Sequence, residues 1–566
     1  MAAIRHWLRR SPAASALRLA RLNVLARSGL HQDFRAFVRP HEPTWQAALA
    51  AASDGPRVLI ATNIGGHFGL SQIDRMLAVA LTLRGARVST VLCDAALPAC
   101  QMCEINLVPK VGRFARRGPP RQLCSYCSGP ARSSCEALML PLVPLGSMLD
   151  DSDKRAAREF ANGVRFENMA AATFEGLPAG EHAVAGALRY FARGEFSKEP
   201  HAEAVARRFL EASALTALAY HRLIERERPE VIVIHHGIYI PQGIVAAVAR
   251  ARGVRVVTWN PAYRKHCFIF SHGDTYHQTL MDEPVDVWRQ PGLTAAEQAR
   301  IETYLASRRR GEEDWIRFHR DPDEALTRDY VSLGIDARKP MVLALTNVFW
   351  DAQLHYRARA FPNQRVWLLD TLNAFVERPD LQLVVRIHPA EASGSPPSRQ
   401  RAQDEIRRAF PVLPANVAVV PPESAVSTYG LAECANAALI YATKTGVELA
   451  AMGLPVVVAG EAWARGKGFT IDVGSPAHYR DVLSRLPFAS RLEPAERSAA
   501  LAYAQHFFFG RMIPIDFVRP TPGPRRFTVE VSNLEALLPG GCTGLDVICS
   551  GILQGSPFIM PRAGSP

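Results

Sequence analysis

Short apolar runs alternate with longer amphipathic segments in the first half of the chain. The apolar runs are continuous and rich in β-branched residues, and they cover 57–63, 87–93, 231–236 and 255–260. Helical segments are predicted between them at 68–84 and 241–252. Strands that are apolar along their whole length belong in a parallel sheet that has helices on both faces. The pattern therefore predicts a doubly wound α/β domain.

The same alternation starts again after a turn at 336–340. Predicted strands cover 341–346, 383–388, 417–420, 438–441 and 455–459. Predicted helices cover 365–377, 398–409, 428–434 and 445–452. An α/β sheet binds its ligands at the carboxyl ends of its strands, and ligand pockets often lie between domains. We therefore expect two Rossmann-like, doubly wound domains that face a cleft.

The chain has 566 residues and is long enough for more than one domain. The sequence divides into a basic extension, a first domain with a cysteine-rich insertion, a second domain and a tail, at 1–50, 51–335 (insertion 93–135), 336–520 and 521–566. Within the first domain, 294–335 is charged and helical and reads as a connector. The tail is rich in glycine and proline, so we expect it to wrap around the body or to be partly mobile.

The first forty residues carry eight arginines and a single acid, Asp33. Three interpretations are open: a basic arm that touches an anionic membrane surface, a solvated helical extension that packs on the body, or an arginine-rich transit peptide. The chain has no apolar run of about 18 residues, as a membrane span requires, and no secretory signal at its start. We therefore expect a cytoplasmic protein, with peripheral attachment to the inner face of the cytoplasmic membrane if the arm binds lipid.

The positive charge of the chain is large and uneven. The formal net charge is +12 at pH 7, and residues 105–132 contain six cations and no acid. Basic surfaces bind nucleic acid, phosphorylated ligands or anionic lipid. The interleaving of aromatic and basic residues that is typical of RNA-binding modules is missing from the sequence. We therefore expect a nucleotide-sugar, an anionic glycan or a membrane as partner, and no nucleic acid.

Polar and glycine residues follow two strands of the first domain. The loop after the first strand contains Gly65, Gly66 and His67, and glycines there allow a tight turn and close approach of the backbone to a ligand. A neutral His67 would take a proton from an acceptor hydroxyl, and the alternative is a histidine that caps the next helix. His235 and His236 end a later strand. We expect His235 to act as a base or to bind a phosphate or carboxylate; the alternative is a buried histidine whose nitrogens are satisfied.

The second domain has polar residues after its first two strands. Asn347 and Asp351 follow the first of these strands. Arg386 and His388 share one face of the second strand because side chains alternate along a strand, and Glu391 follows in the loop. A cation and a histidine at a strand end suit a phosphate or a carboxylate.

Further polar residues follow the last two strands of the second domain. Thr443, Lys444 and Thr445 lie at a strand-to-helix junction, where hydroxyl and N–H groups can hold a phosphate. Glu448 falls in the first helical turn, where it either completes a capping box or accepts a hydrogen bond from a ribose hydroxyl. Lys467 lies in a glycine-rich basic loop. Together these segments predict a pocket for an anionic nucleotide.

Three motifs of the second domain resemble a known family. They are Arg-x-His-Pro, then Thr-x-Thr-Gly-x-Glu with Gly-x-Pro-Val, then Gly-Lys-Gly-Phe-Thr, at 386–389, 443–456 and 466–470. This pattern resembles the capsule polysaccharide biosynthesis proteins, which include the Kdo transferases of bacterial capsules. The His-Pro pair is also similar to that of bacterial sialyltransferases. The resemblance covers 340–475 well and the N-terminal half only in outline.

The resemblance implies a GT-B fold whose second domain binds a nucleotide-sugar donor. By the same resemblance, His388, Thr443 and Thr445 would contact the donor phosphate, and Glu448 would lie at or near its ribose.

The resemblance also implies how the leaving group is handled. Arg386 and Lys467 would neutralise its charge, so no catalytic metal is required. The stereochemistry stays open between inversion with a base such as His67 and retention through a carboxylate such as Asp351.

Two Cys-x-x-Cys pairs lie in the basic insertion. Cys100 and Cys103 are followed, after twenty residues, by Cys124 and Cys127. This is the spacing of a four-thiolate zinc site, and such a site is structural because it has no open position. Free thiols, an iron–sulfur cluster and a redox pair are the alternatives.

Taken together, these features predict a glycosyltransferase that moves a sugar from a nucleotide-sugar to a surface glycan of capsule or lipopolysaccharide type, or to a glycolipid. A nucleotide-sugar epimerase of the same fold is one alternative. A non-catalytic, metal-stabilised subunit of a polysaccharide assembly complex is another. The basic insertion and the basic arm favour a large anionic or membrane-bound acceptor, and therefore the transferase.

Overall fold

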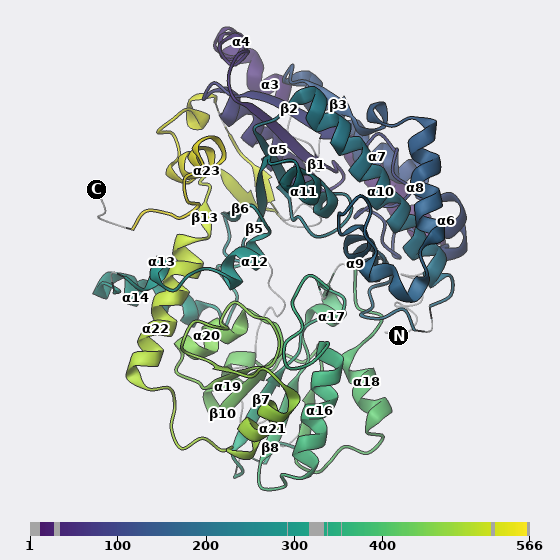
Figure 1. Ribbon diagram of the computed structural model, residues 1–566. Helices are drawn as coiled ribbons and strands as arrows, with labels where there is room; N and C mark the ends of the chain where they lie inside the picture. The colour runs from purple at the N-terminus through teal and green to yellow at the C-terminus, as the bar shows by residue number, and fades with distance from the viewer. Residues whose placement is uncertain are drawn as a thin grey trace. The chain divides into compact units, whose positions relative to one another are not determined.

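The computed structural model describes most of the chain. The described residues are 12–27, 34–197, 199–290, 292–315, 333–336, 338–352, 354–394, 396–521, 527–531 and 533–562. The chain forms two compact units (Figure 1). Unit 1 comprises Met1–Phe191, Phe196–Tyr276 and Arg511–Pro566, and unit 2 comprises Ala192–Glu195 and His277–Gly510.

Unit 1 is built on a seven-stranded sheet in the order β13-β6-β5-β4-β1-β2-β3. In that order the strands span Ile513–Pro514, Cys267–His272, Arg255–Pro261, Val231–His235, Arg57–Asn63, Arg87–Leu92 and Leu142–Pro144. β1 pairs in parallel with β2 and β4, whereas β6 and β13 run antiparallel to their neighbours. The chain winds from β1 toward β3 on one side and from β4 toward β6 on the other. Strand order therefore reverses between β1 and β4.

Helices surround this sheet. They are α2 (Pro12–Arg27), α3 (Phe34–Val38), α4 (Glu42–Ala51), α5 (Phe68–Thr82), α6 (Val111–Arg117), α7 (Arg121–Ala137), α8 (Asp151–Gly163), α9 (Ala179–Phe191), α10 (Ala202–Glu227), α11 (Gln242–Ala251) and α23 (Thr543–Gln554). α5 is buried along almost its whole length, as expected of a helix that is apolar on most of its faces. A separate antiparallel pair, β14 (Val518–Pro520) and β15 (Phe527–Val529), lies beside α5.

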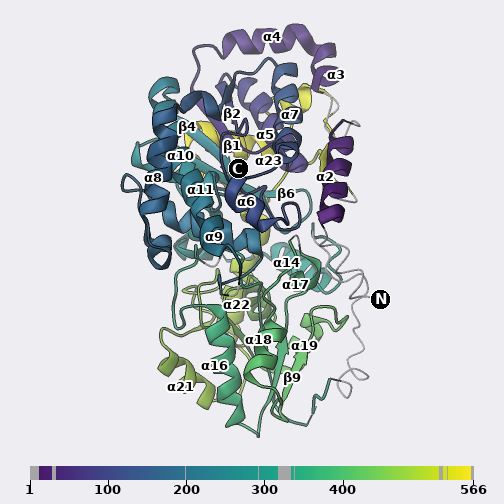
Figure 2. The same cartoon turned by 90° about the vertical axis from the view of Figure 1, so that its right-hand side faces the viewer.

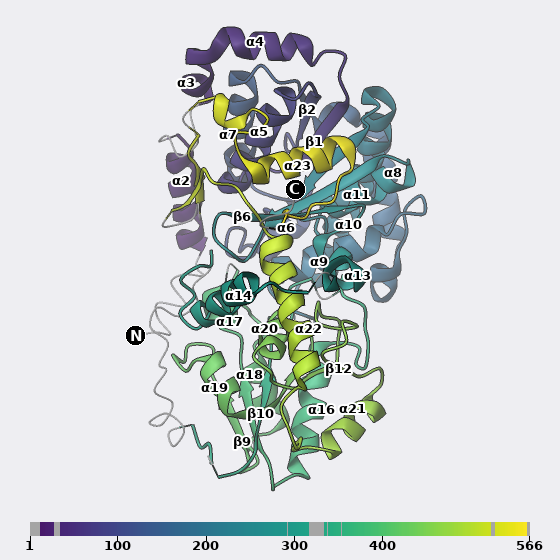
Figure 3. The same ribbon diagram turned by 90° about the vertical axis from the view of Figure 1, so that its left-hand side faces the viewer.

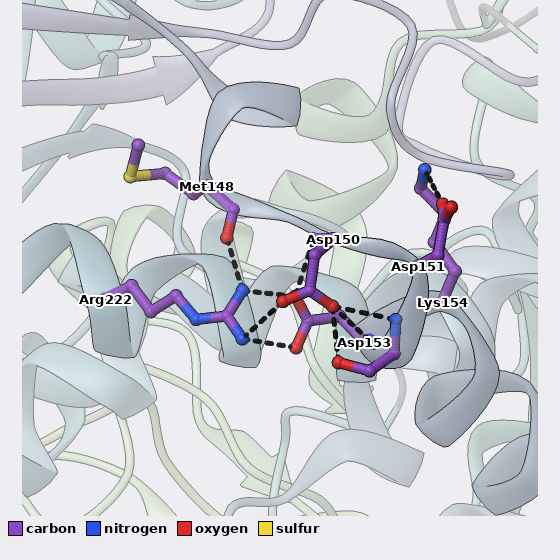
Figure 4. Close-up of polar contacts among 7 residues, drawn as sticks. Met148, Asp150, Asp151, Asp153, Lys154 and Arg222 are labelled. Carbon is purple, nitrogen blue, oxygen red and sulfur yellow. Dashed lines mark hydrogen bonds and ion pairs between the residues drawn. The ribbon is translucent and has the colours of Figure 1, made fainter.

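α8 is fixed against α10 at its first turn (Figures 2 and 4). The carboxylate of Asp150 accepts hydrogen bonds from the backbone N–H groups of Ser152 at 2.8 Å and Asp153 at 3.0 Å. Arg222 of α10 donates to Asp153 Oδ1 at 2.8 Å and to the carbonyl of Met148 at 2.8 Å. A capping box and an ion pair therefore position the start of α8.

Described segments near both ends of the chain pack on unit 1. Trp45 of α4 is fully buried and donates from Nε1 to the carbonyl of Leu138 at 3.0 Å. Leu545, Ile548 and Ile552 of α23 are also fully buried. The described part of the first forty residues also packs on unit 1, because α2 and α3 contact α7 and Phe34 and Val38 are buried. Contact of this segment with a membrane surface stays a prediction. The described tail wraps around the body, as one of its two interpretations predicted.

Unit 2 is built on a six-stranded parallel sheet in the order β12-β11-β10-β7-β8-β9. In that order the strands span Ile471–Asp472, Val456–Val458, Ala435–Ile440, Met341–Leu345, Gln382–Arg386 and Val417–Val420. The chain winds from β7 toward β9 on one side and from β10 toward β12 on the other. Strand order therefore reverses between β7 and β10.

Three described helices of unit 2 precede β7, others alternate with the strands, and two follow β12. These helices are α12 (Tyr276–Met281), α13 (Asp286–Arg289), α14 (Ala295–Ser307), α16 (Gln364–Val376), α17 (Ala390–Ser393), α18 (Ala402–Ala409), α19 (Thr428–Cys434), α20 (Thr445–Ala451), α21 (Pro476–Ser484) and α22 (Pro494–Gln505). α22 lies beside α20 and α14 (Figure 3). In the core, Trp367 of α16 donates from Nε1 to the hydroxyl of Tyr479 of α21 at 3.0 Å.

Both sheets are doubly wound, which confirms the predicted α/β class with two Rossmann-like domains. The structure divides the chain after Tyr276, whereas the sequence analysis drew the boundary after residue 335. It also returns the chain to unit 1 at Arg511. Part of the expected connector, 316–332, lies outside the described residues. A cleft between the domains stays a prediction. Within the described residues, no helix is long and apolar enough to cross a bilayer.

Candidate functional site

The reversal point of unit 1 gathers polar residues at the ends of β1 and β4. Asn63 ends β1 with φ 62°, and His236 follows β4 with φ 67°. Both are non-glycine residues in the left-handed region, which costs conformational energy and is concentrated at functional sites. Ligands of α/β sheets bind at such a reversal of strand order. This edge of the sheet is therefore the candidate site of unit 1.

His235 is held in one orientation at this edge. Its Nε2 lies 2.8 Å from Asn260 Oδ1, and its ring is 4% exposed and packs edge-on against Trp259. Burial lowers the pKa of His235 to about 3, and the neighbouring His67 acts in the same direction. The ring is therefore neutral near pH 7. Its Nε2–H donates to Asn260, so Nδ1 is an acceptor.

His67 lies at the start of α5, next to a tightly packed loop. A Cβ on Gly65 would lie 2.4 Å from the carbonyl oxygen of Cys127, and one on Gly66 would lie 2.6 Å from Met102 Cε. Only glycine fits at position 65, where the contact is with backbone, whereas a side chain at position 66 would require the flexible end of Met102 to move. His67 is half-buried and occupies the N-cap position, but among the described residues its side chain makes no capping hydrogen bond. The capping alternative for His67 is therefore not what the structure has.

The reversal point of unit 2 joins three adjacent strands through polar side chains. Asn347, just after β7, donates from Nδ2 to the carbonyl of Ala442 after β10 at 3.2 Å. Thr346 Oγ1 accepts a hydrogen bond from the backbone N–H of His388 after β8 at 3.1 Å. Asn347 Oδ1 also accepts from the N–H of Val348 at 2.9 Å. Asn347 therefore holds the strand ends together.

His388 is presented at this edge in a defined tautomer. It is half-buried, and its Nδ1 accepts a hydrogen bond from the backbone N–H of Ala390 at 3.1 Å. An Nδ1 that accepts leaves the ring proton of the neutral form on Nε2. Nε2 is thus the donor atom of His388, as recognition of a phosphate oxygen requires.

Two threonine hydroxyls lie at the end of β10, the strand next to β7. Thr443 Oγ1 donates to Thr445 Oγ1 at 3.2 Å and accepts from the backbone N–H of Thr445 at 3.3 Å. Both side chains are half-buried. The structure therefore brings Thr443, Thr445, Asn347 and His388 to the ends of three neighbouring strands.

Arg386 and Lys467, the two cations predicted to face the leaving group, donate hydrogen bonds to backbone carbonyls. Arg386 is 2% exposed and donates to the carbonyls of Pro421 at 2.6 Å and Ser424 at 3.2 Å. Burial lowers the pKa of Arg386 to about 10. Lys467 is also buried, and its Nζ donates to the carbonyls of Met281 at 3.2 Å and Glu283 at 2.7 Å. Both cations fasten loops of unit 2.

Lys444 and Glu448 are paired with each other in a buried charge cluster. Lys444 Nζ lies 2.6 Å from Glu448 Oε1, Arg308 lies 3.2 Å from the same atom, and Tyr429 donates to Oε2. Burial alone would raise the pKa of Glu448, but Arg308 and Lys444 lower it below its usual value. Burial also lowers the pKa of Lys444 to about 8. Neither the capping box nor an exposed ribose contact describes Glu448 here, because its side chain is fully buried among these partners.

The two remaining predicted carboxyls differ in burial. Glu391 is fully buried and accepts from the backbone N–H of Ala402 at 3.1 Å. Burial raises the pKa of Glu391 to about 8, so this group holds its proton near pH 7. Asp351 is exposed. It follows Trp350, which is buried and donates to Ser398 Oγ at 3.1 Å, so Trp350 is a core residue.

All four cysteines of the two Cys-x-x-Cys pairs belong to unit 1. Cys100 and Cys103 are hydrogen-bonded, and the charge of Cys100 raises the pKa of Cys124 and Cys127 further, beyond the larger effect of burial. Cys127 Sγ accepts from the backbone N–H of Gly66 at 3.3 Å. In the described part of the chain, no three His, Cys, Asp or Glu side chains are arranged to hold a metal ion. A structural zinc stays a prediction.

Sequence reasoning did not single out three residues that organise these edges. Asn63 accepts from the hydroxyl of Tyr220 at 2.9 Å, Asn260 orients His235, and Thr346 holds the backbone of His388. All three lie at the end of an apolar strand. That signal was available in the sequence.

No known protein family and no curated protein matches the chain. Among solved structures, the chain is similar to the beta Kdo 2,4 transferase KpsC of Thermosulfurimonas dismutans, with 15% identity and a TM-score of 0.34, over 48% of this chain and 79% of that one. It is also similar to the glycotransferase of kitacinnamycin, with 14% identity and a TM-score of 0.23, over 80% and 95%. UDP-GlcNAc 2-epimerase from Neisseria meningitidis matches with 11% identity and a TM-score of 0.22, over 80% and 95%. At these values the fold assignment rests on the two sheets themselves.

Proposed function

We propose that this protein is a glycosyltransferase of the GT-B type that moves a sugar from a nucleotide-sugar to a glycan or glycolipid acceptor. The observation that carries the proposal is the reversal point of unit 2. There, the Nε2–H of His388 after β8 and the hydroxyls of Thr443 and Thr445 after β10 lie at the ends of the two strands that flank β7. Neutral donors of this kind suit the phosphate oxygens of a nucleotide.

In the proposed reaction, unit 2 binds the donor and stabilises the departing nucleotide. Hydrogen bonds from His388, Thr443 and Thr445 would take up the charge that develops on the phosphate as the bond to the sugar breaks, without a catalytic metal. Arg386 and Lys467 would act from a distance, because both side chains are buried and donate to backbone carbonyls. They would orient the loops that line the site.

Unit 1 would supply the acceptor side. His67 is the proposed base for an inverting transfer, with His235 as a neutral hydrogen-bond acceptor beside it. Retention through Asp351 is the other route. The acceptor we propose is a surface glycan of capsule or lipopolysaccharide type, used by a cytoplasmic enzyme at the inner face of the membrane. The six cations of 105–132 support an anionic acceptor of this kind.

We also propose a structural zinc ion on Cys100, Cys103, Cys124 and Cys127. The proposal rests on their spacing in the sequence. Metal analysis of the purified protein should then find about one zinc per chain. The zinc proposal would be contradicted if the purified protein contained no metal and the Cys124→Ser variant folded normally.

A nucleotide panel tests the donor proposal. A nucleotide or nucleotide-sugar that binds the folded protein at about 100 times its Kd should stabilise it by about 2.7 kcal/mol and raise the melting temperature. We expect His388→Ala to abolish this shift and His478→Ala to keep it, since His478 is an exposed histidine of unit 2 away from the strand ends. An equal shift in both variants would remove the phosphate role of His388.

Turnover then separates the transferase from its alternatives. A transferase releases nucleotide slowly by donor hydrolysis, and faster once acceptor is added. An epimerase changes the sugar and keeps the nucleotide attached. A scaffold does neither, so the absence of both reactions over a panel of CMP- and UDP-linked sugars would overturn the proposed function.

A further inference from the structure

Unit 1 contains a basic cavity that the proposed chemistry does not use. It has a volume of about 500 Å³ and lies between the segment that follows β2, the linker into α7, α8 and α10. Five cations line it: Arg117, Arg121, Lys154, Arg158 and Arg208. Asp94 and Glu211 are the two acids among its lining residues. The cavity therefore carries an excess of positive charge.

Among the described residues, three of the five cations have a carboxylate partner, whereas two arginines have none. Glu211 lies 3.5 Å from Arg158 and 3.7 Å from Arg208, so it serves both. Lys154 pairs with the exposed Asp151 at 2.8 Å. Within the described part of the chain, Arg117 and Arg121 have no ion pair or hydrogen-bonded partner for their side chains. Like charges held close together repel unless an anion joins them.

The backbone on two sides of the cavity is fixed in place, whereas the side chains of Arg117 and Arg121 are exposed. The start of α8, which carries Lys154 and Arg158, is held by Asp150 and Arg222 (Figure 4). Arg208 of α10 donates to the carbonyl of Ala115 at 2.8 Å, which ties α10 to α6. A binding site that is ordered before its ligand arrives loses less entropy on binding.

We propose that this cavity binds a phosphate group of the acceptor substrate. The inference rests on the proposed transferase function. Guanidinium groups bind phosphate oxygens in pairs of parallel hydrogen bonds, and a dianion matches the excess charge better than a single carboxylate does. The cavity lies near the carboxyl end of β2, the edge at which α/β sheets bind ligands. The donor-binding side chains all belong to unit 2, which leaves this cavity to the acceptor.

Calorimetric titration with inorganic pyrophosphate tests the cavity directly. We expect the double variant Arg117→Ser/Arg121→Ser to bind pyrophosphate at least about tenfold more weakly than the wild type. The control Arg113→Ser/Arg155→Ser removes the same charge from α6 and α8, at exposed arginines outside the cavity, and should change affinity less than about twofold. Equal weakening in both double variants would overturn the proposal, as would a wild type that shows no saturable binding.

The same variants tell apart two sources of the phosphate. Binding of glucose 6-phosphate, but not of glucose, that is lost in the Arg117→Ser/Arg121→Ser variant would indicate a phosphorylated sugar. Binding to phosphatidylglycerol vesicles, but not to phosphatidylcholine vesicles, with the same loss would indicate a lipid headgroup. If neither probe binds better to the wild type than to the variant, the acceptor role is overturned.

The outcome is separable from that of the donor proposal. His388→Ala lies in unit 2 and should keep the pyrophosphate binding that depends on Arg117 and Arg121. If the protein binds pyrophosphate through Arg117 and Arg121 but binds no nucleotide-sugar, the anion site is supported and the transferase proposal is contradicted. If the protein binds nucleotide-sugar and the Arg117→Ser/Arg121→Ser variant keeps the wild-type affinity for pyrophosphate, only the cavity proposal is contradicted.

Discussion

At the scale of single residues, Asp74 of α5 is a carboxyl group inside the core of unit 1. Its side chain is 2% exposed, and burial raises its pKa from 3.8 to about 6, although Arg75 acts in the opposite direction. The folded protein therefore holds this proton more tightly than the unfolded chain. Stability is highest below the unfolded pKa and falls as pH rises toward the folded pKa. Above the folded pKa the carboxylate is charged in both states, so the free energy of unfolding carries the full penalty of burying that charge and falls no further.

We expect Asp74→Asn to stabilise unit 1 at about pH 8, by up to about 3 kcal/mol, and to have little effect at about pH 4. The amide keeps the shape of the carboxyl group and carries no charge. Urea unfolding of both proteins at the two pH values measures the difference. Asp54→Asn changes an exposed aspartate and is the control. The same change in stability at both pH values would contradict the raised pKa of Asp74.

The strand ends of unit 2 illustrate what local sequence determines about a residue. The strand pattern predicted that Arg386 and His388 lie at a strand end and Lys467 in the loop after the last strand, because that pattern is local. The partners of the two cations did not follow from it. Arg386 binds carbonyls after β9, and Lys467 binds carbonyls almost two hundred residues earlier in the chain. A cation near a strand end reads the same in the sequence whether it meets a phosphate or a carbonyl.

At the scale of elements, α20 is joined to its surroundings by a buried cluster of charges. Glu448 of α20 is fully buried between Lys444, Arg308 and Tyr429. Arg308 follows α14, and Tyr429 belongs to α19. A single carboxylate thus links three helices that are separated in sequence. The electrostatic attraction is strong because water does not screen it.

We expect Glu448→Gln to lower the stability of unit 2 by about 3–5 kcal/mol, because Lys444 would stay buried without a counter-charge and Arg308 would keep only its ion pair with Asp314. Glu433→Gln also removes a carboxylate that pairs with an arginine, Arg309, but both side chains of that pair are more than one third exposed. That control should cost less than about 1 kcal/mol. Urea unfolding at neutral pH compares the two variants. Equal losses would mean that Glu448 contributes no more than a surface ion pair.

Element positions could be predicted closely wherever the apolar pattern was continuous. β1 and β9 have the bounds that the sequence predicted, and α5 and α11 differ by one or two residues at their ends. β6 was missed: its pattern is as apolar as that of β5, but it turns back antiparallel without an intervening helix. α23 was missed because the tail around it is rich in glycine and proline. Its helix is stabilised by burial against unit 1, a tertiary effect that local propensity does not contain.

At the scale of the whole molecule, the chain crosses between the two units more than once. It leaves unit 1 after Tyr276 and returns at Arg511, and the returning segment adds β13 to the edge of the sheet beside β6. The sequence suggested a later boundary because the charged stretch 294–335 reads as a linker. In the structure, the α14 part of that stretch packs on α22 inside unit 2. The composition of this stretch indicated that it is polar, but its packing determines that the α14 part belongs to unit 2.

The returning tail should therefore contribute to the stability of unit 1 and not to that of unit 2. Ile548 of α23 is fully buried, and α23 packs on α5 and on β4. We expect Ile548→Ala to destabilise unit 1 by about 2–5 kcal/mol, from the lost apolar contacts and the cavity left behind. Hydrogen exchange resolves the effect by unit: amides of β1 and β4 should exchange faster, whereas those of β7 and β10 should be unchanged. Val412→Ala, at a site that is 85% exposed in unit 2, should change neither set. Faster exchange in both sheets would mean that the units unfold together, and no change in β1 would mean that α23 does not support the core of unit 1.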